Sequence, residues 1–164
     1  MKTFKEALDE LKNSKEFKDW KAKNQEAYLS YGFIILPKEN SWKAGFYHPD
    51  NDNITTFTIS NKITIEHEEP VFKPKQTHVN KLEISKVKIT LKKALETAEK
   101  LQKQHYKSQT PVEKIILLQD IDKMGIIWNI TYISKTLETL NIKISAQSGK
   151  VLEHKSIKLF EFKK

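Results

Sequence analysis

Side chains that could bind a metal or carry out acid–base chemistry are scattered along this chain, without the spacing of known sites. The histidines form neither an HExxH motif nor another ligand pattern. Glu66 and Glu68 flank His67 and would share one face of a strand, where a cation could bind; we interpret them as its solvated side. We therefore expect no metal and no cofactor. The histidines are His48, His67, His78, His105 and His154.

Nucleophilic and phosphate-binding motifs are also absent from the sequence. Residues 48–53 have the oxygen-rich look of a calcium loop, but the sixth position counted from Asp50 is Thr55 rather than the required glycine, which favours a hairpin loop. The chain has no cysteine, no GxSxG motif and four glycines in all, too few for a phosphate-cradling loop. We expect no catalytic residues and predict that the protein is not an enzyme.

The charge of the chain comes from lysine alone. The formal net charge is +8, and all 29 basic residues are Lys. Without the planar fork of Arg, sequence-specific recognition of nucleic acid is disfavoured, while non-specific attraction to polyanions stays open as an alternative. No apolar run approaches the ~20 residues of a transmembrane helix, and the first residues do not form a signal peptide. The expected location is cytoplasmic as the chain stands, or exported if a signal segment has been removed.

An internal repeat organises the elements that would position these side chains. The segment Thr3 to Leu8 is echoed by Thr90 to Leu95, an offset of 87 residues (90 − 3). The aromatic segment that begins at Trp42 is echoed from Trp128, an offset of 86 (128 − 42). Two offsets that agree within one residue predict an α+β chain of two tandem units, each a helix followed by an antiparallel sheet.

Local patterns define these elements. Thr3 and Thr90 are predicted N-caps, and a break of helical phase at Asn13-Ser14 predicts two short helices in the first unit. The period then changes to two, as in strands. Hairpin turns are expected at residues 60–62 and at Gly149. The inward-facing strand aromatics would be Trp42, Phe46, Trp128 and Tyr132.

Two prolines mark the boundary between the units. Pro70 and Pro74 prevent continuous pairing in a central strand. The predicted domains are residues 1–68, a linker or edge strand at 69–86, and residues 87–164, with the edge strand placed at 78–87. Whether the two units share one core stays open.

The second unit resembles the PepSY domain, a small helix-plus-sheet module related in shape to cystatins. Its motifs are a Thr that opens an alanine-spaced helix, Ile89 to Ala98, and the hairpin Ser145 to Val151, with the aromatic strand from Trp128 between them. Here Ser145 and Ser148 stand where the family has Asp and Thr. The resemblance implies inhibition of a peptidase or binding of a partner, no catalytic residues, and in most members export.

These observations favour a binding or regulatory protein that takes a protein or peptide, with a possible role in modulating a peptidase. An extended segment could add to an exposed sheet edge, which the sequence does not identify. One alternative is a polyanion binder that acts through Lys. The other is a small-molecule pocket in a curved sheet, whose lining would be Trp42, Phe46, Trp128 and Tyr132. The oligomeric state stays open.

Overall fold

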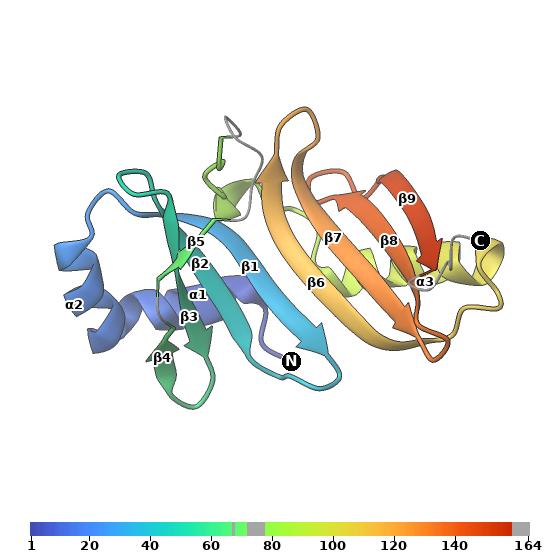
Figure 1. Cartoon of the computed structure of the whole chain (residues 1–164), viewed down its shortest axis with the longest axis horizontal. Coiled ribbons are helices and arrows are strands. Elements are labelled where there is room, and N and C mark those ends of the chain that lie inside the picture. Colours follow the sequence, from blue (N-terminus) through green and yellow to red (C-terminus); the bar gives the residue numbers. More distant parts are fainter. Residues whose placement is uncertain (67, 72–77, 159–164) are drawn as a thin grey trace, which may run out of the picture.

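In the computed structural model, which describes residues 1–66, 68–71 and 78–158, helices cover one face of a single antiparallel sheet (Figure 1). The class is α+β, as predicted. None of the helices in these ranges is long and apolar enough to cross a membrane. In chain order the elements are α1 (Phe4–Asn13), α2 (Lys15–Lys23), β1 (Tyr28–Leu36), β2 (Trp42–His48), β3 (Asn53–Ile59), β4 (Ile63–Ile65), β5 (Glu69–Pro70), η1 (Ile84–Lys86), α3 (Leu91–His105), β6 (Pro111–Ile121), β7 (Gly125–Ser134), β8 (Glu138–Ser145) and β9 (Val151–Lys158).

The sheet joins the two halves of the chain through their first strands. Its order is β4-β3-β2-β1-β6-β7-β8-β9, and β5 pairs with β3. The central pairing, β1 with β6, is antiparallel and runs from Tyr31 opposite Gln119 to Leu36 opposite Lys114. In Figure 1, α1 passes behind the strands of the first half and α3 behind those of the second, on the same face. The two sheets expected from the sequence are therefore one continuous sheet.

Both helix starts predicted from the sequence are confirmed. Thr3 caps α1, and its hydroxyl accepts a hydrogen bond from the backbone N–H of Glu6 at 3.2 Å. Thr90 caps α3 and accepts from the N–H of Lys93, also at 3.2 Å. The break between the first two helices is confirmed at Ser14, which ends α1 and caps α2. Each cap satisfies an N–H that has no partner within its helix.

The predicted hairpins form as their turn residues require. Ile59 lies opposite Ile63, so odd residues face odd ones across the three-residue turn at 60–62. Gly149 turns the chain between β8 and β9 with a φ of +78°, a left-handed conformation that suits glycine. The oxygen-rich segment after His48 is a hairpin loop between β2 and β3, where His48 pairs with Asn53.

The edge strand expected at residues 78–87 is wrong. This segment has no strand and ends in the short 3₁₀-helix η1. The backbone bond that joins it to another segment runs from the Leu82 N–H to the Leu29 carbonyl at 2.8 Å, and two further bonds lie within the segment around η1. The Leu82 side chain is buried at 2% exposure, so core packing holds the segment across the sheet instead of along its edge. Pro74 lies outside the described residues.

One apolar core fills the space between the helices and the sheet, and it continues from the first half into the second. Leu8 and Leu11 of α1 and Ala94 and Ala98 of α3 are almost fully buried in it. The inward strand positions predicted from period-two spacing are buried as well, at 2–3% exposure: Trp42, Phe46, Trp128 and Tyr132.

Candidate functional site

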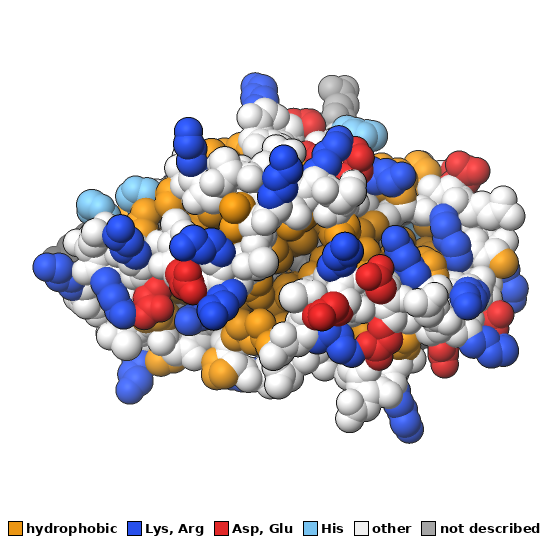
Figure 2. Space-filling view, turned by 180° about the vertical axis from the view of Figure 1, so that it is seen from behind, with side chains coloured by type: hydrophobic (Ala, Val, Ile, Leu, Met, Phe, Trp, Pro, Cys, Tyr) orange, Lys and Arg blue, Asp and Glu red, His pale blue; other side chains and the backbone are white. Residues whose placement is uncertain are grey.

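A hollow of about 480 Å³ lies where the two halves meet, between the first turns of α1 and α3. Seen from the helix side, hydrophobic side chains are exposed in the middle of the molecule, and charged side chains lie to either side of them (Figure 2). We call this hollow the junction pocket. Its size falls within the range typical of small-ligand sites. Its residues are Met1, Lys2, Thr3, Phe4, Lys5, Trp42, Ile84, Val87, Lys88, Ile89, Thr90, Leu91, Lys92, Leu118 and Trp128.

Two tryptophans from corresponding strands line this pocket. The rings of Trp42 and Trp128 have centroids 6.5 Å apart. The indole N–H of Trp42 donates to the carbonyl of Lys2 at 2.9 Å, and that of Trp128 donates to the carbonyl of Ile89 at 2.8 Å. Each bond ties a strand to the residue that precedes a helix N-cap. Both indole donors are used and each side chain is only 2% exposed, so the tryptophans form an apolar base under the pocket with no free donor for a ligand.

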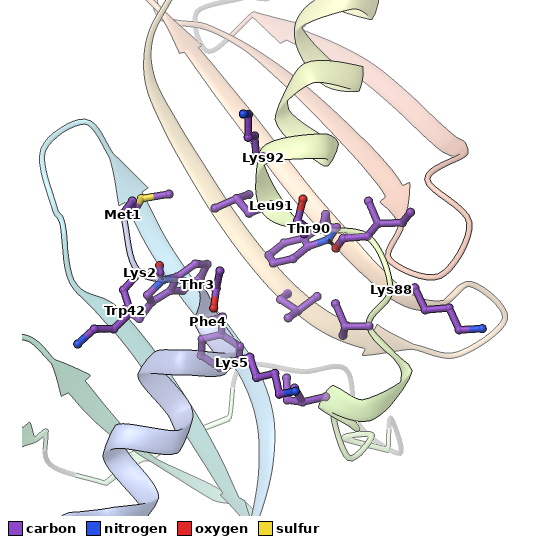
Figure 3. A pocket seen from close by; sticks show the side chains of 15 residues that line it. Met1, Lys2, Thr3, Phe4, Lys5, Trp42, Lys88, Thr90, Leu91 and Lys92 are labelled. Atoms are coloured by element: carbon purple, nitrogen blue, oxygen red, sulfur yellow. Dashed lines mark hydrogen bonds between the residues drawn. The ribbon is translucent and has the colours of Figure 1, made fainter.

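The rim of the junction pocket is positively charged. Four of its residues are lysines and none is acidic (Figure 3). Lys2 pairs with Glu10. Lys5, Lys88 and Lys92 form no ion pair with any residue that the structure describes. An apolar base under a positive rim suits a ligand that combines apolar bulk with negative charge.

The helix starts beside the pocket differ in charge. At α1 the Glu6 carboxylate accepts from the Thr3 N–H at 2.7 Å and from its hydroxyl at 2.8 Å, which completes a capping box. These bonds lower the pKa of Glu6. At α3 the corresponding residue is Lys93, and the first turn has no acidic residue.

Of the four aromatic residues selected from the sequence, two reach the junction pocket. Trp42 and Trp128 line it, whereas Phe46 and Tyr132 lie elsewhere in the core. Phe46 packs against Phe17 with ring centroids 5.1 Å apart. Burial raises the pKa of Tyr132 to about 12, and within the described chain its hydroxyl has no hydrogen-bond partner.

The residues considered for a cation are held by different partners. Glu66 binds Lys43 at 2.8 Å, and Glu68 lies 3.1 Å from the ring of His48. His67 lies outside the described residues. Over the ranges that the structure covers, no group of three or more His, Cys, Asp or Glu could hold a metal.

A second arrangement of histidines lies at the far end of α3. The rings of His105 and His154 stack with centroids 6.1 Å apart. The hydroxyl of Tyr106 lies 2.7 Å from Nδ1 of His154. These contacts fix the end of α3 to β9, the outermost strand of the second half.

Sequence reasoning missed the lysine rim and the place of the pocket between the two halves, although one of its alternatives named a pocket lined by Trp42 and Trp128. One usable signal was present in the sequence, because Lys5 and Lys92 each stand two residues after a predicted N-cap, Thr3 or Thr90. The position of the pocket follows from the pairing of β1 with β6, which local patterns do not specify.

Comparison with known proteins gives a fold but no family. No family model and no curated protein matches the chain. A crystal structure described as that of a putative lipoprotein from Clostridium difficile 630 has 16% sequence identity and a TM-score of 0.56. The match covers 94% of this chain and 93% of that one, so the likeness extends over both halves.

Proposed function

We propose that this protein is a non-enzymatic binding module that captures an acidic segment of a protein or peptide. A large apolar side chain of that segment would sit on Trp42 and Trp128 in the junction pocket. Acidic residues beside it would lie among the rim lysines. The observation that carries the proposal is the pairing of an apolar pocket with a rim of four lysines and no acid.

A peptide fits these features better than a bulk polyanion does. A polyanion needs a broad basic surface, whereas this site combines an apolar hollow with four lysines and no acid. An apolar anchor in a pocket with a charged rim is the usual design of a peptide-binding site. The PepSY resemblance adds the prediction that the partner is a peptidase.

A small amphipathic anion is the second candidate. The volume of about 480 Å³ would also hold such a molecule entirely. Such a ligand would be a free small molecule and not a side chain of a peptide.

A fluorescence titration tests the proposal. The probes are seven-residue peptides with a central Phe flanked by two Glu (the acidic peptide), by two Gln (the amide peptide), or with Ala in place of Phe. The protein carries Trp20→Phe, so that the two pocket tryptophans provide the signal. We expect saturable binding of the acidic peptide, at least tenfold weaker binding of the amide peptide, and no saturation with Ala.

Salt and competition complete the experiment. Raising the salt from 0.05 to 0.5 M should weaken the acidic peptide by about tenfold, since few charges are involved, whereas a polyanion that makes many contacts would lose several powers of ten. No saturable binding of any peptide would contradict the proposal. Binding of dodecanoate without any peptide binding would assign the pocket to a small amphipathic anion instead.

A further inference from the structure

We propose that the junction pocket holds its ligand in one direction, with the negative group of the ligand at α3, between Lys88 and Lys92, and its apolar group toward Phe4 and Trp42. This inference rests on the function proposed above and adds an orientation to it. It follows from a difference between the two sides of one pocket.

The α1 side of the pocket already carries two acids, Glu6 and Glu10, although Lys5 forms no ion pair with a described residue. Lys2 pairs with Glu10, and the Glu6 carboxylate lies in the first turn next to Lys5. The lowered pKa of Glu6 keeps that carboxylate ionised at neutral pH. A second negative charge brought to this side would meet Glu6, which disfavours the anionic end of a ligand here.

The lysines on the α3 side are in excess. Lys93 pairs with Glu96 at 3.5 Å, but Lys88 and Lys92 have no acidic partner among the described residues. Lysines in a first turn also oppose the helix dipole, which favours negative charge at that end. An anionic group bound here would offset both the unpaired lysine charge and the unfavourable interaction of the lysines with the helix dipole. The α3 side of the pocket is therefore the side whose charge is complementary to an anionic group.

The first half of the chain shows how a carboxylate fits beside such a cap. At α1 the Glu6 carboxylate accepts two hydrogen bonds from Thr3, one from the backbone N–H and one from the hydroxyl. At α3 the hydroxyl of Thr90 accepts from Lys93 N, but no side chain in the described ranges accepts from Thr90. Thr90 lines the junction pocket, so a ligand carboxylate can take the part that Glu6 plays at α1.

The pocket lysines stand on two opposite sides of the hollow. In Figure 3, Lys2 and Lys5 stand on the α1 side, while Lys88, Thr90 and Lys92 stand on the α3 side, with the apolar residues between them. In Figure 3 the ammonium groups of Lys88 and Lys92 point away from Thr90, so binding an anion there requires both flexible side chains to change rotamer.

The decisive variant is Lys93→Glu. It places an acid three residues after Thr90, as Glu6 follows Thr3, and so supplies a carboxylate within the chain that competes with the ligand. We expect affinity for the acidic peptide to fall at least tenfold while the melting temperature stays the same or rises. A weaker site in a more stable protein cannot be explained by failed folding. Lys100→Glu, on the exposed surface of the same helix, makes the same change of charge away from the pocket and should alter affinity less than twofold.

A coupling experiment locates the anionic group. Affinities of the acidic and amide peptides are compared in the Trp20→Phe background, with Lys88→Gln and Lys92→Gln together, and with Lys5→Gln. The preference for the acidic peptide should shrink about tenfold in the double variant, the size of one charge-assisted hydrogen bond, and stay within twofold in Lys5→Gln.

Three results would overturn the inference. One is equal weakening by Lys93→Glu and Lys100→Glu, which would show a general effect of charge. Another is a larger loss of preference in Lys5→Gln than in the double variant. The third is an absence of peptide binding by the protein without these lysine changes, which would remove the proposed function as well, whereas the first two results leave that function intact.

Discussion

The helices of the two halves bury the same face of the sheet with side chains of different size. Leu11 of α1 and Ala98 of α3 are 87 residues apart, the offset of the repeat predicted from the sequence, and both are fully buried. Phe4 and Leu91 correspond in the same way at the first helical position. The comparison teaches that the position of a helix over a sheet can be kept while the volume beneath it changes, as long as neighbouring side chains compensate.

The largest expected effect tests this difference in volume. Leu11→Ala should lower the free energy of unfolding by about 3 kcal/mol, because it leaves a cavity in the core of the first half. Ala98→Leu should also destabilise, by about 1–3 kcal/mol, because Ala98 is fully buried and extra methylene groups would overpack the core around it. Urea denaturation measures both. A neutral Ala98→Leu would show that the second half is loosely packed and would break the comparison.

The two pocket tryptophans test whether the halves are equivalent. Trp42→Phe and Trp128→Phe each remove one indole hydrogen bond to a backbone carbonyl, so each should cost about 1–2 kcal/mol. We expect the two losses to agree within about 0.5 kcal/mol in urea denaturation, because each variant loses the same kind of bond from a side chain buried to the same degree. If only one of the two variants lost stability, the two indole bonds would not be equivalent and the comparison of the halves would fail.

Sequence patterns predicted the local parts of this fold well. A Thr before a helical stripe, a break of phase at Ser14 and a glycine at 149 each act over a few residues, where hydrogen bonding within the backbone decides the outcome. The segment 78–87 was misjudged, because its conformation depends on burying Leu82 under residues far away in the sequence. The candidate site was half predicted. Trp42 and Trp128 were selected, but their meeting depends on the β1–β6 pairing, which no nearby residue encodes.

The smallest effect concerns the two helix caps and depends on pH. At pH 7, Thr90→Ala should cost about 1 kcal/mol and Thr3→Ala more, because Thr3 also binds the Glu6 carboxylate. The fold lowers the pKa of Glu6, so its contribution is present above the unfolded glutamate value of about 4.3 and is lost as the pH falls through the folded value. The excess cost of Thr3→Ala should therefore shrink at pH 3 in the same denaturation assay. An excess that is equal at both pH values would contradict the role of Glu6.

The antiparallel pairing of β1 with β6 has a consequence for how such a chain could arise. Two copies of a single half, related by a two-fold axis, would meet through the same like-with-like strand pairing, since antiparallel pairing of equivalent strands is compatible with that symmetry. In a homodimer of that kind, the two sides of the junction pocket would be identical. In a single chain the β1–β6 pairing stays intact at any protein concentration, and one end can change without the other, so that an acid can stand at position 6 and a lysine at position 93.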